Sequence, residues 1–216
     1  MAFFDDLPSK LNSGNLSIGH KRMLQIVEGA IQVFVKIGIE QATYAKIATA
    51  SHVSRPLIQH YFPSKKQIIE ASFKYIRSVV QSQITDYLTL KSLDCKNTKE
   101  FFLEYIAIHF ETFTKKNLSY MHVGFLFLHY SGVDSRLKAH NSTFVRLGFE
   151  RLKGIIEKGI ADKSFGISIN EVGKVARMIQ LLLTGAFVSV ATEIPENVMH
   201  LQKNITATCL QLLKAN

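Results

Sequence analysis

Apolar residues recur at three- and four-residue steps along most of this 216-residue chain, a spacing typical of helices with one buried face. Between residues 19 and 37 the apolar positions are Met23, Ile26, Val27, Ala30, Phe34 and Ile37. Gly38 supplies a stop for that helix. Alternating strand patterns are scarce and Asn-Gly or Asp-Gly hairpin turns are absent from the sequence, so the pattern predicts an all-α fold.

The same spacing predicts further helices downstream, and residues 1–18 are expected to form a flexible arm because Asp, Pro, Ser, Asn and Gly dominate there. Ser168 to Glu171 read as a capping box that opens a helix, and Pro195 opens the last one. The expected helices cover about 44–50, 54–62, 65–89, 98–115, 118–131, 135–161, 168–192 and 195–214.

Three polar residues between positions 43 and 67 are placed to cap the starts of helices. Thr43 can cap the helix over 44–50, and Ser54 can cap the next, with Pro56 in its first turn. Ser64 and Gln67 fit a second capping box. Two short helices are therefore predicted on either side of a turn, followed closely by a third helix.

Charge and composition narrow the class of partner. The net charge is +9, and residues 1–78 hold ten Lys and Arg against five Asp and Glu, which favours a polyanion such as nucleic acid. Hydrophobic residues make up 47% of the chain, enough for a sizeable core. The two cysteines fit a reducing cytosol, and the longest apolar stretch, 178–191, is shorter than the roughly 20 residues of a membrane span. We expect a soluble, cytoplasmic protein.

The helix over 54–62 has the geometry that entry into a DNA major groove requires. Leu57, Ile58 and Phe62 can face inward, and the outward side chains are those of Arg55, Pro56, Gln59 and His60. Arg can read a guanine edge and Gln an adenine edge, while Lys65 and Lys66 can bind phosphates. A plain helical hairpin with solvated charges is the alternative.

Several motifs follow one another in order within residues 21–77. They are Phe34-Val35-Lys36-Ile37-Gly38, Thr43, Ile47-Ala48, Val53-Ser54 and Leu57-Ile58-Gln59-His60-Tyr61-Phe62-Pro63-Ser64-Lys65. With these motifs, residues 21–77 resemble the DNA-binding module of the tetracycline-repressor (TetR) family. Two positions depart from the family pattern. His52 stands where the family usually has Gly, and Gln59 stands where an aromatic residue is common. A positive φ at residue 52 is tolerated by His better than by most residues.

The resemblance implies roles for named residues. Thr43 and Tyr44 would lie near the DNA backbone, and Arg55, Pro56 and His60 would approach bases. Tyr61 and Lys65 would meet phosphates, and Gln59 would hydrogen-bond a phosphate or reach a base. It also implies a homodimer on an inverted repeat, with a DNA-binding domain over 19–66 and a ligand-binding and dimerisation domain over 67–216.

The stretch 178–191 is apolar on nearly every face, so it must be buried on two sides. One side can face its own core and the other a second copy, and two helices from each chain would form a four-helix interface. The expected interface residues are Leu182, Gly185, Ala186, Ser189, Leu201 and Ile205. A large monomeric core is the alternative.

Aromatic residues gather in the two helices over 98–131. They can be ordinary core, but the family resemblance implies a small-molecule pocket there. The candidate ligand-binding residues are Phe102, His109, Phe113, Phe125 and His129. The spacing of His109, His122 and His129 matches no metal motif, and no metal or cofactor is expected.

Motifs for catalysis are missing from the sequence, which has no Gly-rich phosphate loop, no Gly-x-Ser-x-Gly and no His-Glu-x-x-His. We therefore expect a ligand-responsive transcriptional regulator rather than an enzyme, with repression favoured over activation and release from DNA by a small molecule. One alternative is a helical carrier or enzyme with a vestigial DNA module. Another is a DNA-coating protein without sequence preference.

Overall fold

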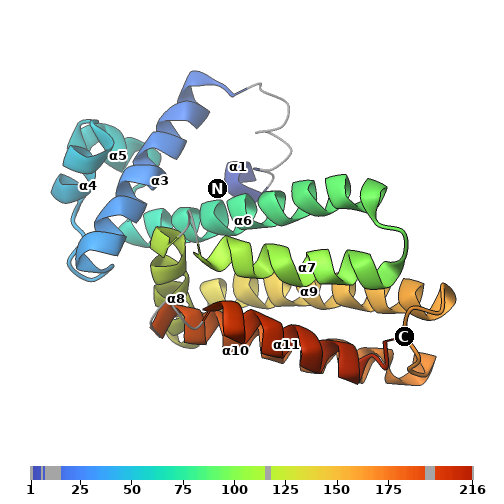
Figure 1. Ribbon diagram of the computed structural model, residues 1–216. Helices are drawn as coiled ribbons and strands as arrows, with labels where there is room; N and C mark the ends of the chain where they lie inside the picture. Colours follow the sequence, from blue (N-terminus) through green and yellow to red (C-terminus); the bar gives the residue numbers. More distant parts are fainter. Residues whose placement is uncertain (1, 6, 8–15, 115–117, 193–197, 216) are drawn as a thin grey trace. The chain divides into compact units, whose positions relative to one another are not determined.

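The computed structural model describes residues 2–5, 7, 16–114, 118–192 and 198–215 (Figure 1). These residues are almost entirely helical. They contain no β-strand, only one isolated antiparallel bridge between Phe165 and Ala215. The predicted all-α fold is confirmed.

From α3 onward, the described connections between consecutive helices are short (Figure 1). Four helices begin and end within one residue of the expected bounds, namely α3 (Ile18–Ile37), α4 (Tyr44–Ser51), α7 (Thr98–Thr114) and α9 (Ser135–Ala161). The expected start of the last helix at Pro195 lies outside the described residues. The elements are α1 (Ala2–Asp5), α3 (Ile18–Ile37), α4 (Tyr44–Ser51), α5 (Arg55–Tyr61), α6 (Lys65–Asp94), α7 (Thr98–Thr114), α8 (Leu118–Val133), α9 (Ser135–Ala161), the 3-10 helix η1 (Ile169–Glu171), α10 (Val172–Thr192) and α11 (Val198–Leu212).

The chain forms two compact units, and each unit takes two stretches of sequence. The first unit comprises Met1–Ser82 and Ser119–Asn141, and the second comprises Gln83–Leu118 and Ser142–Asn216. By packing, the first half of α6 and nearly all of α8 therefore belong with the helix-turn-helix. The functional boundary expected after residue 66 remains a prediction, because compactness and function need not divide the chain at the same place.

The first unit buries three apolar side chains from the segment 1–18, which the sequence predicts to be a flexible arm. Phe3, Phe4 and Leu7 are at most 6% exposed and join the core of this unit. The Phe3 ring stacks on His20 at 4.2 Å between centroids, and Phe4 lies 6.4 Å from the ring of Phe62. The polar composition around these residues concealed three apolar side chains at helical spacing, which burial stabilises.

The second unit packs α7, α10 and α11 against one another around a core that includes Phe102 and Cys209. The Asp162 carboxylate accepts the backbone N–H of Thr98 at 2.8 Å and that of Ser164 at 3.0 Å, and thereby ties the start of α7 to the end of α9. At Gly159 an added Cβ would lie 2.0 Å from the Phe165 ring. Glycine is required there so that the ring can lie against the helix backbone.

One described segment, Ile169–Val190, is long and apolar enough to cross a membrane, with a mean hydropathy of 1.3. A third of that segment is buried inside the second unit. Core helices of water-soluble proteins also reach this length and hydropathy, so the segment is weak support for membrane insertion.

Candidate nucleic-acid interface

Close contact between α3 and α4 fixes the first helix of the helix-turn-helix. A Cβ added at Gly29 would lie 2.6–2.8 Å from the Cβ, N and Cα of Ser51, so only glycine allows this approach. Gln25 donates from Nε2 to the Ser51 carbonyl at 2.7 Å, and the Ser51 hydroxyl donates to the Ile47 carbonyl at 2.6 Å. The sequence analysis missed Gln25, Gly29 and Ser51, although a glycine inside a helical pattern signals close packing.

The turn between α4 and α5 is built by His52 in the left-handed conformation, with φ 53° and ψ 39°. The positive φ that the sequence left open at this position is present. Val53 donates its N–H to the Ala48 carbonyl at 3.2 Å, so the last turn of α4 keeps its hydrogen bonds as the chain reverses.

Both expected caps of the short helices are confirmed. The Thr43 hydroxyl accepts the Lys46 N–H at 3.3 Å, and the Ser54 hydroxyl accepts the Leu57 N–H at 3.4 Å. Pro56 lies in the first turn of α5, where its missing N–H removes no helical hydrogen bond. Each cap satisfies an amide that the helix itself leaves unpaired.

The two faces of α5 divide as expected. Ile58 and Phe62 are fully buried, and Leu57 is half-buried. The four exposed residues on the other side are Arg55, Pro56, Gln59 and His60. Half-buried Tyr61 contacts the His60 ring edge-on at 5.2 Å. Polar side-chain ends on a helix whose opposite face is buried can approach the edges of DNA bases. The contacts of these residues with DNA remain predictions.

Tyr44 contacts the end of α5, a position that the sequence did not indicate. Its hydroxyl donates to the Phe62 carbonyl at 2.9 Å, so it links the two helices in the free protein. Burial raises the pKa of this phenol, and the positive charge of Arg55 opposes that rise. Tyr44 therefore stays protonated and keeps its proton to donate at neutral pH.

The capping box at the start of α6 is confirmed. Ser64 Oγ accepts the Gln67 N–H at 3.4 Å, and the Gln67 side chain accepts the Ser64 N–H at 3.2 Å. Lys65 donates from Nζ to the Glu40 carbonyl at 2.9 Å, and Lys66 is exposed. An ammonium has three donors, so Lys65 keeps two for a phosphate.

The predicted ligand-binding residues divide between the two units. Phe102 is fully buried in the second unit, where His109 Nδ1 lies 2.7 Å from the Tyr105 carbonyl. Burial lowers the pKa of His109 to about 4, so the ring is neutral. Half-buried Phe125 and exposed His129 belong to the first unit, and the side chain of Phe113 lies outside the described residues. The ligand set remains a prediction.

The expected dimer interface remains a prediction, and its six residues differ in how exposed they are within a single chain. Ala186 is 2% exposed and Ile205 is 8% exposed, so both are buried within the chain itself. Leu182, Ser189 and Leu201 are half-buried, and Gly185 is exposed with open space around its Cα. The sequence analysis missed the apolar side chains that α10 exposes beside Gly185, namely Met178, Leu181 and Val188.

Within the described part of the chain, no group of three or more His, Cys, Asp or Glu side chains could hold a metal ion.

Comparison with known proteins places the helix-turn-helix in a family. Residues 26–72 match the model described as bacterial regulatory proteins, tetR family. The HTH-type transcriptional regulator BetI of Escherichia coli (strain K12 / DH10B) is 30% identical over 67 residues, which are 31% of this chain and 34% of BetI. The chain thus matches about a third of the length of these curated relatives.

Solved structures share the whole fold at low sequence identity. A TetR-family transcriptional regulator from Cytophaga hutchinsonii superposes with a TM-score of 0.73 at 20% identity, over 93% of this chain and 96% of that one. A putative transcriptional regulator from Saccharomonospora viridis, in complex with choline, gives a TM-score of 0.74 at 16% identity, over 88% and 96%. These likenesses extend the agreement in fold beyond the helix-turn-helix.

Proposed function

Because this chain belongs to the tetR family of bacterial regulatory proteins, we propose that it is a sequence-specific DNA-binding regulator of transcription. The observation that carries the proposal is the exposed row Arg55, Pro56, Gln59 and His60 on a helix whose opposite face is buried. Lys65 and Lys66 follow at the start of α6, where side-chain ammonium groups and helix amides suit a DNA phosphate.

The regulator acts as a homodimer in this proposal, and each α5 enters one major groove of an inverted repeat. The exposed apolar side chains of Met178, Leu181 and Val188 support a partner on α10, and open Gly185 lets a second helix approach closely. The half-buried Leu182, Ser189 and Leu201 would border that contact. Two helices from each chain, α10 and α11, would make the interface.

A small molecule bound in the C-terminal half releases the protein from DNA in this proposal, so the protein is a repressor in the cytoplasm. The effector would shift the population toward a state in which the two α5 helices no longer fit successive grooves. The relative from Saccharomonospora viridis, whose structure contains choline, illustrates that this fold can hold a small molecule. The effector of this chain is proposed without a name.

A genomic selection tests the proposal first. Purified full-length protein is mixed with sheared DNA of its own organism and competitor at near-physiological salt, and the retained DNA is sequenced. Enrichment of one inverted repeat is the expected result. Equal retention of every sequence would instead mark a general DNA-coating protein, and no retention would contradict the proposal.

Two variants then test the docking of α5 and α6 on the selected site. Arg55→Ala should relax the preference at one base pair and weaken specific binding by about 1–3 kcal/mol. Lys65→Ala should weaken binding to all sequences alike and lower the salt dependence by about one phosphate contact. Lys96→Ala removes the same charge from an exposed position in the second unit and is the control. Equal effects of all three changes would contradict the docking.

A further inference from the structure

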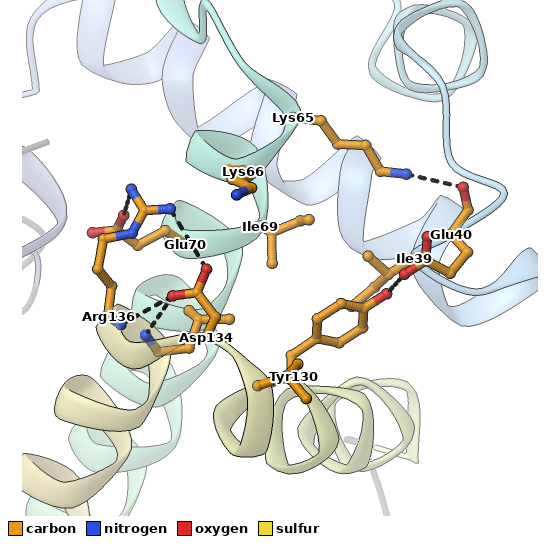
Figure 2. Close-up of a pocket in the computed structure, with 11 residues that line it drawn as sticks. Ile39, Glu40, Lys65, Lys66, Ile69, Glu70, Tyr130, Asp134 and Arg136 are labelled. Carbon is orange, nitrogen blue, oxygen red and sulfur yellow. Dashed lines mark hydrogen bonds and ion pairs between the residues drawn. The ribbon is translucent and has the colours of Figure 1, made fainter.

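A cavity of about 350 Å³ lies within the first unit, beside the start of α6 (Figure 2). Its walls come from the chain after α3, the first turns of α6, the end of α8 and the start of α9. Small-molecule pockets have volumes of roughly 300–1,000 Å³, so this cavity is large enough for a ligand. The cavity is distinct from the predicted ligand residues Phe102 and His109, which belong to the second unit.

All three acidic side chains that line the cavity already have partners. Glu70 accepts Lys74 at 3.1 Å and contacts His140 at 3.2 Å. Burial would raise the pKa of Glu70, but Lys74 and His140 outweigh burial and hold that pKa below its usual value. Asp134 accepts the first amides of α9, including that of Arg136 at 2.9 Å. The Glu40 carboxylate accepts the Tyr130 hydroxyl. These interactions leave the acids little capacity to bind a cation.

Two cationic side chains at the cavity remain available. In the part of the chain that the structure describes, the side chain of Lys66 forms no hydrogen bond or ion pair. Arg136 lies 3.9 Å from Glu70 and 3.6 Å from Asp134, and its side chain is 53% exposed. Hydrogen bonds to charged groups are shorter, about 2.7–2.9 Å, so the guanidinium can turn to a better acceptor. Figure 2 shows Lys66 between the cluster around Arg136 and the cluster around Glu40.

The rest of the wall is apolar. Ile39 is 2% exposed, Ile69 9% and Leu137 4%, and Val133 adds an exposed apolar side chain at the rim. A ligand with one anionic group and a hydrocarbon body would satisfy both parts of the wall. A purely inorganic anion would leave the apolar part in contact with water.

We propose that this cavity binds a small organic carboxylate, whose anionic group is held by Lys66 and Arg136 and whose body packs on Ile39, Ile69 and Leu137. The guanidinium offers two parallel donors to the carboxylate, and the ammonium adds a third. The site would be a second place for an effector, next to the DNA-binding helices themselves.

Occupation of the cavity should act on DNA binding through Lys65, a part of the inference that rests on the proposed function. Lys65 and Glu40 both line the cavity, and Lys65 donates to the Glu40 carbonyl at 2.9 Å. A carboxylate beside Lys65 would compete with a DNA phosphate for the remaining donors. The ligand should therefore weaken DNA binding, and DNA should weaken ligand binding by the same factor.

Calorimetric titration of the full-length protein with 2-naphthoate tests the site without DNA. The neutral 2-naphthamide has the same body and lacks the charge, so it should bind at least about tenfold more weakly. Lys66→Ala and Arg136→Ala should each weaken naphthoate binding by about tenfold or more. Lys138→Ala removes an exposed charge from the same helix as Arg136 and should leave the affinity unchanged. The exposed positions of Lys66 and Arg136 let both variants fold, which thermal unfolding checks.

Four results would overturn the site. Three of them are no saturable binding of naphthoate, equal binding of naphthoate and naphthamide, and equal losses in Lys138→Ala and Lys66→Ala. The fourth is naphthoate affinity that survives both cation changes but disappears in Phe102→Ala, which would locate the ligand in the second unit. Since the titration contains no DNA, a protein that selects no DNA sequence could still bind naphthoate. The two proposals therefore fail separately.

Discussion

The short helices of the helix-turn-helix in the first unit and the long helices of the second unit are stabilised by different kinds of interaction. α4 has 8 residues and α5 has 7. Both depend on single hydrogen bonds, which the Thr43 and Ser54 hydroxyls accept and the Tyr44 hydroxyl donates. α10 has 21 residues and α9 has 27, and apolar burial fixes α10 and the part of α9 from Ser142 onward in the second unit.

The difference has a physical reason. Helices shorter than about 12–15 residues are marginal in water, so α4 and α5 need their caps and buried contacts to exist at all. Long helices form more readily and need only an apolar face. The stability of the surface proposed to read DNA should therefore be sensitive to changes of a few atoms. The stability of the second unit should be sensitive mainly to changes of buried volume.

The largest expected effect comes from removing one aromatic ring from each unit. Phe62 and Phe102 are both fully buried, so Phe62→Ala and Phe102→Ala should each lower the free energy of unfolding by about 3–5 kcal/mol. Urea titration measures this loss. Phe62→Ala should also abolish DNA binding at temperatures where the protein stays folded, because Phe62 ends α5. DNA binding that survives Phe62→Ala but not Phe102→Ala would reverse the assignment of the two units.

Glycines at close contacts provide the next test. Gly29→Ala would place a methyl group against the Ser51 backbone, and Gly159→Ala would place one against the Phe165 ring. Overpacking of this kind should destabilise the protein by about 1–3 kcal/mol. Gly154→Ala lies on α9 with open space around the added methyl, and it should be neutral or stabilise by up to about 1 kcal/mol. Thermal unfolding compares all three.

In that comparison the Gly29 variant should lose DNA affinity as well as stability. The Gly159 variant should keep its affinity for DNA. A Gly29 variant as stable as the Gly154 variant would mean that α3 and α4 do not approach as closely as described.

Acid should weaken the second unit through His109. The unfolded chain takes up a proton near pH 6.5, but burial lowers the pKa of folded His109 to about 4. The free energy of unfolding should therefore fall as pH drops from 6.5 to 4, by at most about 1.4 kcal/mol per pH unit from this group. Below pH 4 this contribution becomes constant. Urea titrations at several values between pH 4 and pH 6.5 measure this dependence. The free energy of unfolding should change less steeply with pH in His109→Gln, whose amide can still donate to the Tyr105 carbonyl. An unchanged slope would contradict the buried, neutral ring.

The smallest expected effect concerns the turn between α4 and α5. His52 adopts φ 53°, a conformation that glycine reaches without strain. His52→Gly should stabilise the protein by no more than about 1 kcal/mol, because glycine also gains freedom in the unfolded chain. His52→Val should destabilise it, since a β-branched residue resists positive φ. A higher thermal unfolding temperature for His52→Val than for His52→Gly would contradict the left-handed conformation of this turn.

Local features of the first unit could be predicted from the sequence. The Thr43, Ser54 and Ser64 caps each depend on residues within a few positions of one another. The division of α5 into an exposed face and a buried face followed from its periodicity alone.

Contacts between distant residues could not be predicted in the same way. Phe4 packs near Phe62, far along the chain, and Tyr44 donates to the Phe62 carbonyl rather than pointing only outward. In α10 nearly every face is apolar, so the pattern did not indicate that Ala186 would be buried and Leu181 exposed. The cavity beside Lys66 combines four separate segments, and no local motif marks it.

The first unit is built from two separate stretches of the chain, and this has a consequence for its synthesis on the ribosome. Phe73 in α6 packs edge-on against Phe127 in α8 at 5.0 Å, and both belong to the core of that unit. Translation proceeds at about 5–20 residues per second, so the roughly 60 residues that separate residue 82 from residue 141 take about 3–12 seconds. During that interval the nascent helix-turn-helix has emerged with part of its apolar surface uncovered, and only the arrival of α8 completes it. A nascent chain stalled before residue 119 should therefore bind chaperones that recognise exposed apolar surface, and one stalled well after residue 141 should release them.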